Sequence, residues 1–385
     1  MASISSETAS QRLLRYCLSQ EPWPADLLRE ALLEDGGRTF LRVVVERLGD
    51  LFEPSLCQVY GRLFSSVIEL VRPELRGAAL LARYDRIRQP RVCSFEPMQV
   101  VVLSRITLGA DVAVTSVLLD AAKRRFPKAR ICFAGAMKNG ELFAADERIE
   151  VLPVSYPRSG SLIERIAAFH PLAVKDAIVI DTDSRITQLG LLPICDEARH
   201  FFFESRAFGG DSHDSLPLLA QRWAKQTFGV DANAYVATPP VDMDASIAVS
   251  FGVGENEEKR LDGTFEADFL RLLQERGQVV IDKGAGGEEA MRAEALARLI
   301  PNVRTYEGPY AMFAARIARA KLYVGYDSAG QHVASASGTP LVSIFAGYPS
   351  DRFVDRWRPK GTVIKATTPS RVLDEVSAAL QNLTL

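Results

Sequence analysis

The chain has 385 residues, of which 47% are hydrophobic and 24% are charged, and its formal net charge is −2. This balance is typical of a globular protein with two or three domains, and it excludes nucleic-acid binding driven by the charge of the whole chain. No apolar run approaches the ~20 residues of a membrane-spanning helix, and the opening residues, MASISSETAS, lack the basic and apolar regions of a signal peptide.

The cysteines and histidines do not indicate a metal centre. The five cysteines lie far apart without a C-x-x-C pair, and the four histidines show no spacing typical of metal ligands. We therefore expect free thiols, no bound metal and a reducing, cytoplasmic location.

Residues 1–92 are predicted to form an all-helical region. Apolar residues recur at helical spacing in 13–18, 41–48 and 59–70. The simplest interpretation is an add-on that packs against the body of the protein. The alternatives are a dimer surface, a face that docks a protein partner, or peripheral contact with the inner face of the membrane.

Residues 93–237 are predicted to form a first Rossmann-like domain, the acceptor domain, in which strands and helices alternate. Strands are expected at 98–103, 130–133, 149–152, 177–180 and 201–203, and helices at 111–126, 162–169 and 216–228.

A proline-containing link then leads into a second Rossmann-like domain, the donor domain, predicted at 238–385. Its strands are expected at 247–250, 278–281, 322–324 and 341–345, and its helices at 265–276, 289–299, 331–337 and 370–380, while residues 310–319 lead into the strand at 322–324. Alternating strands and helices predict parallel sheets covered on both faces. The expected fold is therefore α/β, with two parallel-sheet domains facing a cleft and with ligands at the carboxyl ends of the strands.

The stretch LYVGYDSAGQHVASASGTPLVSIFAG, residues 322–347, carries the most informative pattern. A strand leads through Asp327 into the small residues Ser328, Ala329 and Gly330, and a helix follows with His332 in its first turn. The first N–H groups of a helix lack internal partners and carry a partial positive charge, so this turn is suited to bind a phosphate. The alternative is an ordinary strand–helix turn in which Asp327 or Ser328 caps the helix.

Other strand-end loops contribute further polar groups. Lys259, Lys283 and Glu288 would join the helix tip in a site for a nucleotide diphosphate. In the first half, Arg105, Asp111, Asp183, Arg185 and Arg206 would form the acceptor side, with a carboxylate that takes a proton from the acceptor hydroxyl.

The sequence resembles glycosyltransferase family 9, the heptosyltransferase family. The resemblance covers about 98–385. It rests on Asp327-Ser328 with His332 five residues after the Asp, on the run Ser104-Arg-Ile-Thr-Leu-Gly-Ala-Asp111, and on the lysine-bearing loop at Lys259.

This resemblance implies a GT-B fold and inverting, metal-independent transfer from a nucleotide diphosphate sugar to a saccharide or glycolipid acceptor, in cell-envelope glycan synthesis. It implies that Asp111 is the general base, that Lys259 neutralises the diphosphate, and that the turn from Asp327 to His332 holds the phosphates and the sugar.

The chain departs from the family pattern at two positions. Ala329 stands where the family has glycine, with Gly330 following it, and Ala110 is an extra residue between Gly109 and Asp111. One additional loop residue can move a carboxylate by about 3 Å.

Other interpretations remain open. Asp181-Thr-Asp183 has the spacing of the metal site in the other large glycosyltransferase fold, although we expect Asp183 and Arg185 to shape the acceptor side instead. A non-catalytic module that binds a nucleotide sugar or a glycan, and a GT-B-fold sugar-nucleotide epimerase, are the alternative functions.

Overall fold

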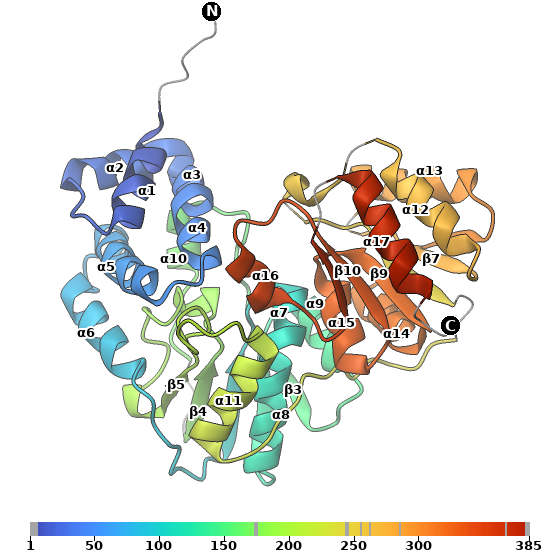
Figure 1. Ribbon diagram of the computed structural model, residues 1–385. Coiled ribbons are helices and arrows are strands. Elements are labelled where there is room, and N and C mark those ends of the chain that lie inside the picture. The colour runs from blue at the N-terminus through green and yellow to red at the C-terminus, as the bar shows by residue number, and fades with distance from the viewer. Residues whose placement is uncertain are drawn as a thin grey trace, which may run out of the picture.

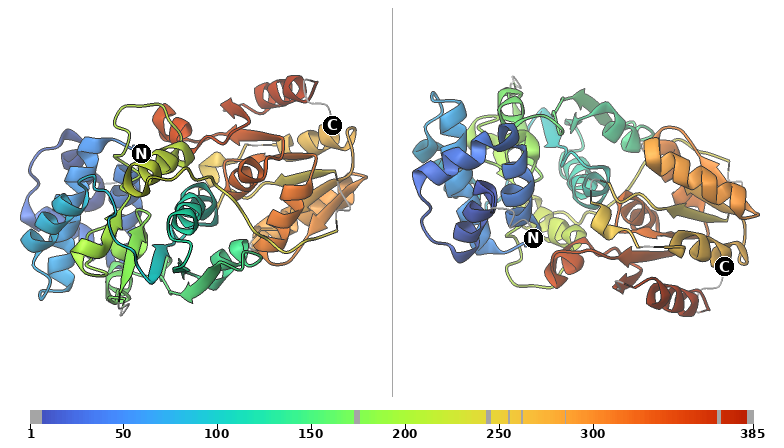
Figure 2. Two further views of the ribbon diagram at one scale, coloured as in Figure 1. Left: turned by 90° about the horizontal axis from the view of Figure 1, so that it is seen from below. Right: turned by 90° about the horizontal axis from the view of Figure 1, so that it is seen from above.

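A computed structural model describes residues 7–381 except 173–175, 243–245, 255, 262, 285 and 366–367. It shows a helical region followed by two lobes, each built on a parallel sheet (Figure 1). Viewed from below and from above, the helical region and the second lobe lie at opposite ends of the molecule (Figure 2).

The helical region contains α1 (Ala9–Ser19), α2 (Ala25–Leu33), α3 (Arg38–Phe40), α4 (Glu46–Asp50), α5 (Pro54–Val71) and α6 (Gly77–Ile87). The first lobe contains β1 (Gln99–Leu103), α7 (Leu108–Ala110), α8 (Ser116–Arg125), β2 (Arg130–Gly135), α9 (Met137–Gly140), β3 (Ile149–Pro153), α10 (Leu162–Ala167), β4 (Ala177–Asp181), β5 (His200–Phe202) and α11 (Leu216–Phe228). A π-helical turn, η3 (Asp111–Thr115), joins α7 to α8.

The second lobe contains β6 (Ile247–Ser250), α12 (Phe265–Gln274), β7 (Val279–Asp282), α13 (Gly287–Leu299), β8 (Val303–Tyr306), α14 (Tyr310–Arg319), β9 (Leu322–Tyr326), α15 (Ala329–Ser337), β10 (Leu341–Phe345), α16 (Asp351–Trp357), β11 (Thr362–Lys365) and α17 (Pro369–Gln381). The predicted strands and helices are present, whereas the sequence analysis did not predict α9, β8, α14, α16 and β11.

Both sheets are parallel, as predicted. The strand order is β3-β2-β1-β4-β5 in the first lobe and β11-β10-β9-β6-β7-β8 in the second, and every described pairing is parallel. The carboxyl ends of the strands in each sheet therefore meet at one edge, where loops collect polar residues.

The helical region forms one of the two layers that cover the first sheet. On β1, Val100 and Val102 belong to a core shared with α8 and α11, whereas Val101 and Leu103 belong to a core shared with α5 and α6. Side chains on a strand point alternately to the two faces of its sheet, so the first helices bury the face that α8 and α11 leave open.

Arginines of α6 and the segment after it fasten this layer to the first lobe. Arg83 donates to the carbonyl of Gly190 at 2.9 Å, and Arg86 makes two hydrogen bonds of 2.8 Å to the carboxylate of Glu197. The basic character of this part of the chain therefore serves internal contacts. In the described part of the chain, no helix combines the length and the apolar character needed to cross a membrane.

If the helical region and the first lobe share one core, they should unfold together. Leu63 of α5 is fully buried in that core. Leu63→Ala is therefore expected to lower the free energy of unfolding by about 2–5 kcal/mol. Urea unfolding followed in variants that keep only Trp23 or only Trp223 should give one midpoint, and the substitution should shift both signals equally. Leu33→Ala is the control, because 82% of the Leu33 side chain is exposed. Separate midpoints would show that the helices are an independent unit.

Candidate functional site

The N-terminus of α15 faces the first lobe. Ser328 is the residue that precedes the helix, and its side chain caps no backbone N–H. Its hydroxyl is buried and has no partner among the described residues. Gly330 is required at the tip because the hydroxyl of Tyr323 lies where a side chain would begin. The first turn of the helix therefore offers N–H groups that no side chain satisfies.

A chain of polar contacts fixes Lys259 beside this tip. Its ammonium group lies 2.7 Å from the carboxylate of Asp327 and donates to the Asp327 carbonyl at 3.2 Å. The other carboxylate oxygen of Asp327 accepts from Gln331 at 2.5 Å, and Gln331 in turn accepts from the hydroxyl of Ser343. Gln331 was not among the predicted residues, because nothing in the sequence shows that an amide one position before His332 would bind Asp327.

His332 is a buried, neutral side chain. Its ring centroid lies 5.6 Å from that of Trp357, and burial, together with the charge of Lys259, lowers its pKa to about 4 against an opposing effect of Asp327. At neutral pH the imidazole therefore acts as a hydrogen-bonding group, not as a cation.

Gly109 of the first lobe packs directly on the helix tip. A Cβ atom at this position would lie 3.1 Å from the Cα of Ala329 and 3.1 Å from the Cδ2 of His332. The loop after β1 and the loop after β9 thus meet, as expected of loops at facing strand ends. In this arrangement the loop at Gly109 covers the tip, so a phosphate reaches the N–H groups only when that loop withdraws.

Asp111 is enclosed in the first lobe. Its side chain is fully buried, and its carboxylate accepts from the hydroxyls of Ser104 and Thr115 at 2.7 Å, from the backbone N–H of Arg105 at 2.7 Å and from Asn139 at 2.6 Å. Burial raises its pKa, and the hydrogen bonds oppose that shift. These contacts hold the loop that carries Gly109, and a substrate proton reaches Asp111 only if the loop opens.

The predicted acceptor residues Asp183, Arg206 and Arg105 form one buried cluster. Arg206 binds both oxygens of Asp183, at 3.0 and 3.1 Å, and Ser205 donates to Asp183 at 2.8 Å while it accepts from Arg105. The two arginines hold the pKa of Asp183 low despite its burial. Asp181 instead contacts His200 at 3.2 Å, so the two carboxylates of the Asp-Thr-Asp triplet are bound to different partners.

The remaining predicted residues lie apart from these clusters. Lys283 is paired with Glu294 at 2.6 Å and Glu307 at 2.7 Å, and Glu288 is exposed in the first turn of α13. Arg185 is half-buried at the start of a short 3₁₀ helix after β4. Across the part of the chain that the structure describes, no three His, Cys, Asp or Glu side chains are grouped to hold a metal ion.

Trp357 of α16 is a site residue that the sequence analysis missed. Its ring centroid lies 6.3 Å from that of Phe52 in the helical region, and the guanidinium of Arg105 lies 5.8 Å from it. Because the His332 ring also lies 5.6 Å from it, Trp357 contacts all three parts of the protein. The only signal in the sequence is a tryptophan in a short, charged segment.

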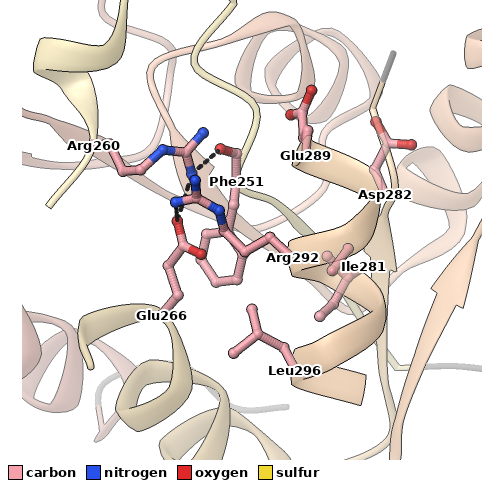
Figure 3. Close-up of a pocket in the computed structure, with 9 residues that line it drawn as sticks. Phe251, Arg260, Glu266, Ile281, Asp282, Glu289, Arg292 and Leu296 are labelled. Carbon is pink, nitrogen blue, oxygen red and sulfur yellow. Dashed lines mark hydrogen bonds and ion pairs between the residues drawn. The ribbon is translucent and has the colours of Figure 1, made fainter. Parts of the chain in front are cut away.

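A small open pocket lies at the carboxyl ends of β6 and β7 (Figure 3). Arg260 and Arg292 approach the carboxylate of Glu266, at 2.7 and 3.8 Å, on one side of it. Asp282 and Glu289 stand on the other side, and burial raises the pKa of Asp282 to about 6. The pocket thus combines an apolar floor with carboxylates that can accept hydrogen bonds from hydroxyl groups.

Comparison with known proteins shows which family the chain resembles. The sequence model of glycosyltransferase family 9 (heptosyltransferase) matches residues 193–379, and no curated protein matches the chain. The structure of Escherichia coli heptosyltransferase WaaC with ADP is 15% identical, with a TM-score of 0.56, and the match covers 74% of this chain and 100% of that one.

Two further structures have the same fold. A family 9 glycosyltransferase from Veillonella parvula is 16% identical with a TM-score of 0.52, over 76% of this chain and 92% of that one. The E. coli ADP-heptose LPS heptosyltransferase II is 18% identical with a TM-score of 0.51, and the match covers 74% of this chain and 99% of that one. The resemblance to family 9 and the GT-B fold are therefore confirmed.

The buried state of His332 predicts a pH-dependent stability. A histidine in the unfolded chain titrates near pH 6.5, whereas His332 titrates at about 4. The unfolded chain therefore binds the extra proton between these values, and the free energy of unfolding should fall by up to about 3 kcal/mol as the pH drops from 6.5 to 4. Urea unfolding of the wild type and of His332→Gln at pH 7, 5.5 and 4.5 measures this contribution as a difference in slope. Parallel slopes would contradict it.

Proposed function

We propose that this chain, a glycosyltransferase of family 9, transfers a sugar from a nucleotide diphosphate sugar to a hydroxyl of a saccharide or glycolipid acceptor. The transfer inverts the anomeric carbon and needs no metal ion. The observation that carries the proposal is the uncapped N-terminus of α15, which faces the first lobe beside Lys259.

The donor diphosphate would bind at this tip. Backbone N–H groups at Ser328, Ala329 and Gly330 would face the phosphates, and the positive end of the helix favours their charge. Lys259 would turn from Asp327 toward the leaving diphosphate. For the donor to enter, the loop at Gly109 must move away from Ala329.

The nucleoside would extend toward the pocket at the ends of β6 and β7. Asp282 and Glu289 offer carboxylates of the kind that bind ribose hydroxyls, and Phe251 offers an apolar surface. The E. coli relatives are named as heptosyltransferases, one of them solved with ADP. We therefore propose an ADP-activated heptose or hexose as the first donor to test, and a cell-envelope glycan such as lipopolysaccharide as the acceptor.

The chemical step is a direct displacement. The oxygen of the acceptor hydroxyl forms a bond to the anomeric carbon while the bond from that carbon to the phosphate oxygen breaks, and the diphosphate leaves with the electron pair. The acceptor proton passes to a carboxylate. The role of Asp111 as this base stays a prediction that requires its loop to open, and Asp183 is the second candidate.

The free thiols support a cytoplasmic location for the reaction. Four of the cysteines are buried and all five are free, which fits a reducing compartment. We propose that the enzyme acts in the cytoplasm on acceptors presented at the inner face of the membrane.

The first experiment is a thermal-shift panel with ADP, UDP and GDP, followed by assays for release of nucleoside diphosphate from the matching sugars. One nucleotide should raise the melting temperature, and its sugar should be consumed only in the presence of an acceptor, with or without a chelator. Binding without turnover would favour the non-catalytic module, and a changed sugar without release of nucleotide would favour an epimerase. No shift with any nucleotide would contradict the proposal.

Lys259 should be required for turnover. Lys259→Met removes the charge that would stabilise the leaving diphosphate, and the loss of one such donor typically lowers kcat about 100-fold. The control is Lys225→Met, which removes an exposed lysine paired with Asp231 in the first lobe. Steady-state kinetics and titration with the nucleoside diphosphate check the prediction. Wild-type kinetics in Lys259→Met would exclude the assigned donor site.

A further inference from the structure

The end of α4 brings the helical region to the place where all three parts of the protein meet. Gly49 lies against Arg206 of the first lobe, since a Cβ atom at Gly49 would be 3.8 Å from the Arg206 Cδ. Phe52 contacts the second lobe, with ring centroids 6.4 Å from Phe353 and 6.3 Å from Trp357. Figure 1 shows α4 beside α16. Asp50 stands between these two contact residues in the sequence.

The carboxylate of Asp50 is half-buried and unpaired. It makes no hydrogen bond or ion pair with any residue that the structure describes, whereas Asp111, Asp183 and Asp327 are each held by two or more donors. A partly buried carboxylate without a partner lowers stability, so an unpaired one calls for an explanation such as a missing ligand.

Charged groups surround Asp50 on three elements. Arg185 acts on it from the first lobe and Lys259 from the second, while Glu46 and Arg47 act from α4 itself. Lys259 is also the lysine that pairs with Asp327 beside the helix tip. Asp50 therefore lies within the electrostatic reach of Lys259 beside the helix tip and of Arg185, a predicted acceptor-side residue.

The backbone next to Asp50 is held in a strained form. Phe52 has φ +54°, which is an outlier for a bulky residue, and two residues of the first lobe, Ile106 at +75° and Asp183 at +67°, also have positive φ. Strained residues persist only where their surroundings fix them, and they cluster at functional sites. Phe52 lies two residues after the end of α4, and its contacts with Phe353 and Trp357 hold it in this conformation.

We propose that the helical region supplies part of the active site, and that Asp50 receives the proton of the acceptor hydroxyl. This inference rests on the proposed function. The O–H bond of the acceptor breaks as its oxygen bonds to the anomeric carbon, the proton goes to the Asp50 carboxylate, and the diphosphate leaves with the electrons of the broken carbon–oxygen bond. Unlike the carboxylate of Asp111, that of Asp50 has no hydrogen bonds to break before it takes up a proton.

The acid–base character of Asp50 agrees with this role. Burial raises its pKa to about 6 although Arg185 and Lys259 oppose the shift. Such a carboxylate is ionised at neutral pH and is a stronger base than an exposed aspartate, which is the compromise that general bases need.

The test compares Asp50→Asn with Glu46→Gln and Asp111→Asn. Asp50→Asn should lower kcat at least 100-fold, leave the affinity for the nucleoside diphosphate unchanged, and leave the melting temperature equal to or above that of the wild type, because the removed carboxylate had no partner. The rise of kcat/KM through about pH 6 should disappear, and Asp50→Glu should restore part of the rate. Glu46→Gln, one helical turn away and exposed, should keep kcat at neutral pH and only shift the rise of kcat/KM to lower pH, because Glu46 contributes to the raised pKa of Asp50.

The outcomes separate this inference from the proposed function. If the wild type transfers sugar and Asp50→Asn does so at the same rate, Asp50 is not the base. Loss of turnover in Asp111→Asn with unchanged stability would then assign the role to Asp111. If the wild type neither binds nor consumes any donor, both the inference and the proposed function fail.

Discussion

Helix α16 holds the two lobes at one separation, and the site depends on that separation. Arg356 is fully buried between the lobes and donates to the carbonyls of Asp214 at 2.7 Å and Gly210 at 2.9 Å. The next residue, Trp357, packs its ring against residues of all three regions. Because a guanidinium carries several donors in a rigid plane, it fixes the orientation of its partners as well as their distance. The hydrogen bonds of Arg356 therefore help to keep Gly109 of the first lobe against the tip of α15.

The first role of the helical region is to cover one face of the first sheet. A parallel sheet needs cover on both faces, and in the first lobe α8 and α11 cover only one. The helices that precede β1 supply the second layer, and the same packing carries the end of α4 to the crevice. The helices that bury Val101 and Leu103 thus also place Asp50 within the electrostatic reach of Lys259.

The sequence predicted the central strands and the helix tip because their local patterns are strong. Short apolar runs indicate β9 and β10. Gly338 follows α15 with φ +75°, as expected of a glycine that ends a helix. The two missed strands, β8 and β11, are the edges of the second sheet, where one side is open to water and sequences such as VRTY lack an apolar run. Helix α16 was missed because its apolar residues pack on another lobe, not on a neighbour in sequence.

For the site, the sequence located Lys259, Asp327 and His332 in one cluster, but it could not show how many donors surround Asp111. A spacing gives the position of a carboxylate, whereas its hydrogen bonds depend on residues such as Asn139 that are distant in sequence. Phe52 and Asp183 have positive φ, yet both side chains are buried between parts of the protein. Glycine would ease the backbone at either position, but it would remove the Phe52 ring from Phe353 and Trp357, or leave the buried Arg206 without its carboxylate. Because either loss exceeds the backbone gain, both residues hold unfavourable turns in place through the neighbours that they join.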